Sequence, residues 1–410
     1  MRKMKQSSVE WLGKIPESWD IGRIGKLYTE RREKVSDTEY RPLSVTMKGI
    51  LPQLSTAAKT DAHDDRKLVR KGDFAINSRS DRRGSCGISS YDGSVSLINT
   101  ILTPRGEMHP VYYDWLFHSS MFSDEFYKWG HGIVDDLWTT GWQDMKKIAV
   151  PLPPYGEQER IAEYLNSKCS RIDSVIEQTR ASIEEYKKLK QAVITQAVTK
   201  GIRPGRKMKD SGIEWIGEIP EEWIVKKLKY LSVFAQTKYS VDDGELNYIG
   251  LENIVGWNGN LIETDSVYDR DQSLICEAGD ILFGKLRPYL AKVYISPIKQ
   301  CCSGEFAVVR FHDELCKEYF WYQLISHGFI FMVDRSTYGT KMPRANADFI
   351  KNIGMAVPPI EEQQKIVDYL NEKCIEMDRL IQNKQLFLSE LETYKKSLIY
   401  EYVTGKKEVV

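Results

Sequence analysis

The sequence contains an internal repeat, and this repeat limits the possible folds more than any other feature. The segment VEWLGKIPESW at 9–19 returns as IEWIGEIPEEW at 213–223, and PPYGEQERIAEYLNSKC at 153–169 returns as PPIEEQQKIVDYLNEKC at 358–374. The stretches between these blocks have similar lengths but different sequences. Because such a repeat indicates one structural unit used twice, we expect two similar halves, each with a globular part followed by a helix.

The second repeated block has the spacing of a long helix. Two rows of mainly apolar residues recur every seven residues, beginning at Leu165 and Cys169 in the first copy and at Leu370 and Cys374 in the second. A stripe with this period requires a partner helix, and the nearest equivalent stripe is the other copy. Each helix would extend over roughly 43 residues, or about 64 Å at 1.5 Å per residue.

The direction of the helices follows from the segment between the halves. The linker GIRPG at 201–205 is too short to lead the chain back along the first helix. The second helix must therefore run antiparallel to the first. Short extended apolar pieces and amphipathic stretches fill the globular parts. We thus expect an α+β fold with two mixed α/β domains, 1–155 and 202–359, joined by two long antiparallel coiled-coil helices, 156–201 and 360–410, in a pseudo-two-fold repeat.

Length and composition fit this organisation. A chain of 410 residues with 41% hydrophobic residues is long enough for two or three folded domains. No apolar run approaches the roughly 18 residues of a membrane span, and the first residues lack a signal peptide, so we expect a cytoplasmic protein without membrane contact. The seven cysteines form no CxxC pair and the six histidines no HxxxH pair. We therefore expect reduced, buried cysteines, no metal site and no cofactor.

Motifs for catalysis are missing. An amino-methyltransferase needs an acidic or amide residue before a Pro-Pro-aromatic turn, but the turn of this type at 152–155 begins with leucine. No phosphate-binding loop of the GxxxxGKS type occurs. The fragment Asp65-Arg66-Lys67 fits the D-x-K pattern of nucleases without an evident upstream carboxylate. We therefore expect a non-catalytic protein.

The two repeated blocks resemble the repeated segments of type I restriction-modification specificity subunits. The resemblance spans the whole chain, and both blocks recur in the alternating order of that family. It implies two target recognition domains, each of which reads one half of a split double-stranded DNA target. It also implies that the helices set the spacer length and bind two methyltransferase subunits. Adenine methylation from S-adenosylmethionine would belong to these partners, and ATP-driven cleavage to two restriction subunits where the system has them.

Sequence-specific DNA recognition requires cations for phosphates and rigid donors for base edges. Seven basic residues face two acidic ones in 66–83, and the end of this stretch has the composition of a basic loop between strands. The alternative is an ordinary solvated turn. The second half has a counterpart after the strand GDILFG. The candidate DNA-binding residues of these two loops are Arg79, Ser80, Arg82, Arg83, Lys285, Arg287 and Tyr289.

A second pair of candidate loops lies just before each helix, at 130–141 and 335–346. Both are polar, contain glycine and occupy the same repeat register with different sequences. Two DNA-contacting loops that share a backbone frame but recognise different bases would have this pattern. The candidate DNA-binding residues here are His131, Thr139, Thr140, Thr337, Tyr338, Thr340, Lys341, Arg344 and Asn346, and we favour Lys341 and Arg344.

The repeated tryptophans Trp11, Trp19, Trp215 and Trp223 have two possible roles. Tryptophan is favoured at interfaces, so they could form a duplicated docking patch for the methyltransferase subunits. They could equally attach each globular part to the helix pair, in which case the outward faces of the helices are the other candidate for docking.

Two other functional classes compete with a DNA-specificity subunit. One is a self-contained methyltransferase or nuclease, which the missing motifs disfavour. The other is a coiled-coil interaction scaffold that does not read DNA, which agrees with the equal numbers of 58 basic and 58 acidic residues. Within the family, a methylation-only or phage-defence relative would have the same repeat.

Overall fold

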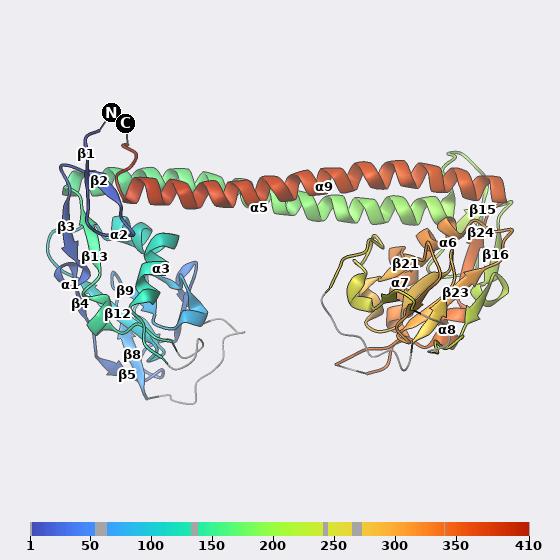
Figure 1. The fold of residues 1–410 in the computed structure, drawn as a ribbon, viewed down its shortest axis with the longest axis horizontal. Helices are drawn as coiled ribbons and strands as arrows, with labels where there is room; N and C mark the ends of the chain where they lie inside the picture. The colour runs from blue at the N-terminus through green and yellow to red at the C-terminus, as the bar shows by residue number, and fades with distance from the viewer. Residues whose placement is uncertain are drawn as a thin grey trace. The chain divides into compact units, whose positions relative to one another are not determined.

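The computed structural model describes residues 2–53, 64–132, 138–240, 245–264, 273–339 and 341–409. The chain forms two compact units. Unit 1 comprises Met1–Arg180 and Leu386–Val410, and unit 2 comprises Ala181–Gln385. Two long helices, α5 (Tyr155–Lys200) and α9 (Ile360–Val403), each contribute to both units (Figure 1).

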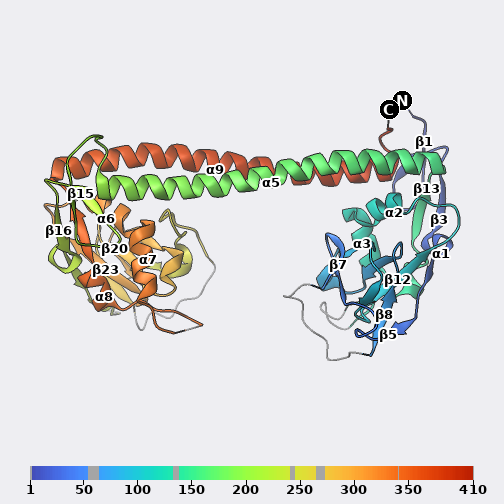
Figure 2. The same ribbon diagram turned by 180° about the vertical axis from the view of Figure 1, so that it is seen from behind.

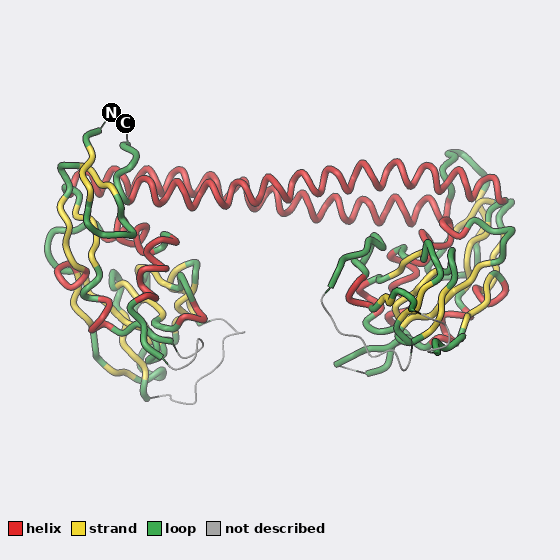
Figure 3. The backbone as a smooth tube through the Cα atoms, in the orientation of Figure 1, coloured by secondary structure: helices red, strands yellow, loops and turns green. Residues whose placement is uncertain are grey.

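The globular part of unit 1 mixes strands and short helices (Figure 3). Its main sheet is antiparallel, and its strand order is β10-β9-β12-β4. A three-stranded sheet (β11-β8-β5), two hairpins (β1-β2 and β6-β7) and the pair β3-β13 complete the strands named in the described residues. The bounds are β1 (Met4–Gln6), β2 (Lys14–Pro16), β3 (Asp20–Arg23), α1 (Ile24–Leu27), β4 (Tyr28–Glu30), β5 (Lys34–Val35), β6 (Leu43–Thr46), β7 (Gly49–Pro52), β8 (Arg66–Val69), β9 (Phe74–Asn77), η1 (Ser80–Arg82), β10 (Cys86–Ile88), β11 (Gly93–Val95), β12 (Asn99–Pro104), α2 (Pro110–Phe117), α3 (Ser120–Lys128), α4 (Trp142–Met145) and β13 (Ala149–Leu152).

Unit 2 repeats this frame. Its four-stranded sheet has the order β17-β23-β20-β21, which is the equivalent order, and β16 pairs with β24 as β3 pairs with β13. The bounds are β14 (Met208–Asp210), β15 (Glu218–Pro220), β16 (Ile224–Lys227), η3 (Leu228–Tyr230), β17 (Ser232–Ala235), β18 (Tyr248–Ile249), η5 (Leu251–Asn253), β19 (Leu274–Cys276), β20 (Ile281–Gly284), η6 (Pro288–Leu290), β21 (Val293–Ile295), β22 (Gln300–Cys302), β23 (Phe306–Phe311), α6 (Lys317–Leu324), α7 (His327–Arg335), α8 (Ala347–Asn352) and β24 (Gly354–Val357). The predicted mixed α/β repeat is thus confirmed.

The two long helices pair antiparallel within each unit. In unit 1, Lys395 of α9 bonds Asp173 of α5 at 2.6 Å. In unit 2, Lys190 of α5 bonds Asp378 of α9 at 2.7 Å. These are the same two repeat positions with the helices exchanged, as a two-fold repeat requires. Both views show the helices side by side (Figure 2), and the predicted antiparallel arrangement is confirmed.

The heptad rows explain why these helices pair. The row that contains Cys169, Ile176, Ile183, Lys190 and Ala197 is buried at every position. The apolar members lose water-exposed surface only when a second helix covers them, so the pairing is driven mainly by the hydrophobic effect. Lys190 is tolerated in the row because its ammonium reaches the carboxylate of Asp378.

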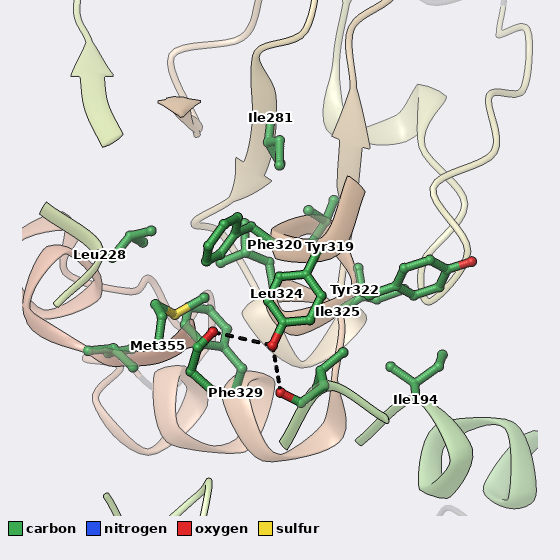
Figure 4. Packing of buried hydrophobic residues seen from close by; sticks show 14 of the residues in the cluster. Ile194, Leu228, Ile281, Tyr319, Phe320, Tyr322, Leu324, Ile325, Phe329 and Met355 are labelled. Carbon is green, nitrogen blue, oxygen red and sulfur yellow. Dashed lines mark hydrogen bonds between the residues drawn. The ribbon is translucent and has the colours of Figure 1, made fainter. Parts of the chain in front are cut away.

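Each globular part packs against the start of one long helix and the end of the other. The core of unit 1 includes Leu165 of α5 and Tyr402 of α9, and that of unit 2 includes Leu370 of α9 and Val198 of α5. A buried tyrosine caps each helix end. The hydroxyl of Tyr112 donates to the carbonyl of Val403 at 2.7 Å, and that of Tyr319 to the carbonyl of Val198 at 2.9 Å. Figure 4 shows Tyr319 within the core of unit 2.

Glycines end both helices. The sequence predicted a distal helix at 360–410, but α9 ends at Val403. Gly405 adopts a φ of 70°, where residues with a β-carbon are strained, and its N–H donates to the carbonyl of Tyr402. Gly201 (φ 75°) ends α5 after Lys200 in the same way.

Several expectations from composition can be compared with the described residues. All seven cysteines are buried, as predicted. In the part of the chain that the structure describes, no helix has the length and apolarity needed to cross a membrane. Among the same residues, no three His, Cys, Asp or Glu side chains gather in a way that could hold a metal ion.

Candidate nucleic-acid interface

The two candidate loops of unit 2 lie side by side, although they are about fifty residues apart in the sequence. The backbone N–H of Ala345 donates to the carbonyl of Lys285 at 2.8 Å, and that of Arg287 to the carbonyl of Pro343 at 2.7 Å. Arg344 lies between these two bonds. The segment around Arg344 therefore extends the end of β20 as an added strand.

The candidate loops of unit 1 meet through the same backbone bonds. Thr140 donates to Ser78 at 2.9 Å, and Ser80 donates to Trp138 at 3.0 Å. Thr139 therefore has the position that Arg344 has in unit 2. It also exchanges backbone bonds with His131, as Arg344 does with Tyr338. Two segments that the sequence could only suggest separately thus form one surface in each unit.

The side chains on this common frame differ between the units. Unit 2 presents Lys285, Arg287 and Arg344, whereas the equivalent positions of unit 1 are Ser78, Ser80 and Thr139. The Lys285 ammonium donates to the carbonyl of Gly304 at 2.9 Å, and burial lowers its pKa. Unit 2 therefore has a strongly cationic version of a surface that is neutral at the same positions in unit 1.

Arg287 has a strained backbone. Its φ of 51° lies in the left-handed region, which costs a residue with a β-carbon about 1–3 kcal/mol. Its buried Nε lacks a hydrogen-bond partner within the described residues. Such strain is kept where the surrounding structure enforces it, and it often occurs at functional sites.

The remaining candidates of unit 1 have different environments. Arg82 and Arg83 are exposed, and Arg83 lies 5.0 Å over the Tyr127 ring and 3.4 Å from Asp124. His131 is exposed at 3.4 Å from Asp144. Thr140 is fully buried, and its hydroxyl donates to the carbonyl of Phe126, so this side chain has a structural role.

The remaining candidates of unit 2 divide in the same way. Tyr289, Tyr338 and Lys341 are exposed. Asn346 caps α8 by accepting from the N–H of Asp348, and the Thr337 hydroxyl bonds Asp334 locally. Thr340 lies outside the described residues.

Two features of this surface gave no signal in the sequence. Glu305 bonds the guanidinium of Arg344, but a single acid before a strand has many possible roles. A groove of about 710 Å³ opens beside Lys285 and is also lined by Lys238 and Lys351. These lysines are far apart in the sequence, and only folding brings them together.

All four repeated tryptophans are buried within their own units. Trp19 donates to Glu157 at 2.8 Å, and Trp223 donates to Glu362 at 3.1 Å. Each glutamate belongs to the first turn of a long helix. For Trp19 and Trp223, these contacts match the alternative in which the tryptophans attach each globular part to the helix pair.

Replacing Glu362 with alanine should destabilise unit 2. The change leaves the buried N–H of Trp223 without its acceptor and takes a carboxylate from Arg206. An unsatisfied buried group costs about 1–3 kcal/mol, which for roughly 200 residues lowers the melting temperature by about 2–12 °C. Glu361→Ala is the matched control, since this exposed glutamate lies in the same helical turn. Equal melting temperatures for the two variants would contradict the attachment role.

Comparison with known proteins shows what this chain is similar to. Residues 220–385 match the family described as "Type I restriction modification DNA specificity domain". The MjaVIII specificity subunit of Methanocaldococcus jannaschii, a type I restriction enzyme subunit, is 26% identical over 97% of this chain and 94% of its own length. The EcoDI specificity subunit of Escherichia coli is 23% identical over 64% of this chain and 63% of its own.

Solved structures show the same fold over nearly the whole chain. One, from a study of complex assembly and conformational transition of the type I R-M system, has a TM-score of 0.72 at 15% identity and covers 96% of this chain and 99% of its own. The HsdS subunit from Thermoanaerobacter tengcongensis has a TM-score of 0.52 at 17% identity and covers 96% and 98%. Together with the duplicated frame and the two long helices, these matches show that the chain shares the fold of both solved proteins and that residues 220–385 match the type I restriction modification DNA specificity domain.

Proposed function

We propose that this chain is the DNA-reading subunit of a type I methyltransferase complex, in which each unit recognises one half of a bipartite double-stranded target. The observation that carries this proposal is the pair of equivalent surfaces. The same backbone bonds hold different side chains at the same positions, such as Arg344 and Thr139. Recognition of two different half-sites requires the same backbone frame to carry different side chains that contact base edges.

The chain itself would have no catalytic role. Methyl transfer from S-adenosylmethionine belongs to the two methyltransferase subunits in this proposal, and DNA cleavage to ATP-dependent restriction subunits where the system includes them. The relatives named above are called specificity subunits of type I restriction enzymes, which supports this division. A methylation-only or phage-defence complex would use the same reading function.

The test is selective DNA binding by the chain assembled with its methyltransferase partners. Genomic fragments retained by the complex should share one bipartite motif. Retention of fragments without a shared motif would favour a scaffold that does not read DNA. Methylation of DNA by the purified chain alone would favour a self-contained enzyme.

In the same assay, Lys341→Ala should weaken binding to all sequences. Lys341 is exposed beside Arg344 and provides a point charge suited to a phosphate. The plot of log K against log salt has a negative slope, and loss of one phosphate contact should reduce the magnitude of this slope by about 0.9. Lys226→Ala removes an exposed lysine from β16 in the same unit and serves as control. An unchanged salt slope in Lys341→Ala would exclude this loop from the interface.

We further propose that the methyltransferase subunits dock on the outward faces of the helices. Leu189 and Leu380 are exposed in unit 2, and their repeat equivalents, Tyr394 and Val175, are exposed in unit 1. Exposed apolar residues at repeated positions would suit two copies of one partner. The double variant Leu189→Glu, Leu380→Glu should reduce the complex from two methyltransferase subunits to one, as measured by native mass spectrometry.

The control for this variant is Ile375→Glu. Ile375 is also exposed on α9, but its repeat equivalent is Ser170, so it is not part of the duplicated set. Two bound methyltransferase subunits in the Leu189 and Leu380 double variant would exclude these positions from docking.

A further inference from the structure

Arg344 is held unusually firmly for an exposed side chain on a loop. Its backbone N–H and carbonyl both bond Tyr338, at 3.1 and 3.3 Å, and the next residue, Ala345, bonds Lys285. The backbone around Arg344 is therefore held by hydrogen bonds to the Tyr338 side and to the Lys285 side of the loop. The side chain remains about half exposed and available to a ligand.

Glu305 fixes the direction of the Arg344 side chain. One carboxylate oxygen, Oε1, accepts from Nη2 of Arg344. Glu305 is itself anchored, since its backbone carbonyl accepts from the N–H of Lys285 at 2.9 Å. Within the described residues this contact uses one of the five guanidinium donors, which leaves the other four available to a planar acceptor. A guanidinium oriented in advance loses less rotamer freedom when it binds.

We propose that Arg344 reads a guanine in the half-site of unit 2 and that Glu305 is its positioning residue; this inference rests on the proposed function. Arginine forms two parallel bonds to O6 and N7 of guanine, which requires a fixed fork direction. A phosphate contact has no such requirement, and the neighbouring Lys341 can supply it.

Unit 1 lacks this device at the equivalent positions. Thr139 stands where unit 2 has Arg344, and Ile98 stands where unit 2 has Glu305. The structural equivalence is direct, since Ser78 donates to the carbonyl of Ile98 as Lys285 donates to that of Glu305. The guanine contact of this Arg–Glu pair should therefore belong to the half-site of unit 2.

The test uses the complex with its methyltransferase subunits and duplexes that carry every single base-pair change in the bipartite target. The wild-type complex should disfavour replacement of one G·C pair by about 5- to 150-fold. Arg344→Ala should abolish this discrimination at that pair and keep it at every other. Arg344→Lys should weaken this discrimination with an unchanged salt slope, because lysine keeps the charge but lacks the fixed fork.

Glu305→Gln tests the positioning role. It should reduce discrimination at the same base pair, with little change at the others, whereas a merely structural role would lower affinity for all duplexes alike. Lys226→Ala is the control, since this exposed lysine belongs to β16 in the same unit and lies outside both candidate loops. It should leave discrimination unchanged.

Three results separate the possible failures. A uniform loss of affinity in Arg344→Ala, with a lower salt slope, would make Arg344 a phosphate contact and overturn the inference. An unchanged base preference in Arg344→Ala and Arg344→Lys would overturn it as well. If the wild-type complex showed no base preference at any position, the proposed function itself would fail.

Discussion

Replacing residues 20–150 with the matching region of a relative should change one half of the DNA target completely and leave the other half unchanged. The exchanged region contains the whole candidate surface of unit 1, from Arg79 to Thr140. Trp19 and Glu157, which attach this domain to the first turn of α5, lie outside it. Methylome sequencing of a host that carries the chimera would report both half-sites.

The chimera must keep the contacts that cross the exchange boundary, such as the bonds of His109 to Gln158 and of Trp115 to Asn166. Tyr112 lies inside the exchanged region and bonds Val403 at the end of α9, so the donor sequence should have tyrosine at this position. A chimera with Tyr112→Phe measures the contribution of this bond to stability. Changes in both half-sites, or in neither, would contradict independent reading by the two units.

Inserting four residues in both long helices should lengthen the nonspecific spacer of the target by one or two base pairs. The insertions belong after Arg180 in α5 and after Gln385 in α9, where the chain passes from one unit to the other. Four residues add about 6 Å at 1.5 Å per residue. Base pairs are stacked about 3.4 Å apart along the duplex.

The insertion should preserve helix pairing because four residues exceed one helical turn of 3.6 residues by only about 40°. Contacts on either side, such as Lys395 with Asp173 and Lys190 with Asp378, stay within their own units. An insertion in α5 alone is the control, since it shifts one helix past the other and should reduce stability. A correctly folded double insertion that keeps the original spacer would show that the helices do not set the distance.

The sequence was sufficient to predict the repeat and the helix pairing, because both depend on periodic patterns. The rows through Cys169 and Cys374 recur every seven residues, and a period of this kind has one structural interpretation. The end of α9 was less predictable. The predicted helix continued to 410, whereas α9 ends at Val403, just before Gly405 in its left-handed conformation.

The candidate surface could be predicted only in part. The positions of the candidate loops in the two repeats indicated that they could bind DNA. Their side-by-side placement, however, depends on tertiary hydrogen bonds such as that between Ala345 and Lys285. Glu305 had no sequence signal, because its importance comes from its contact with Arg344. Thr140 lies in a polar stretch of sequence that suggests an exposed loop, yet packing of the loop against α3 buries this side chain. The roles of the tryptophans were undecided because burial depends on neighbours far away in the sequence.

The most direct test of the central claim, that each unit reads one half of a split target, is methylome sequencing of a host with and without this gene. The account predicts one methylated motif with two specific half-sites and a nonspecific spacer of fixed length, which disappears when the gene is deleted. It also predicts that Arg344→Ala relaxes one base pair in one half-site. A motif without a spacer, or a methylome that does not change on deletion, would contradict it.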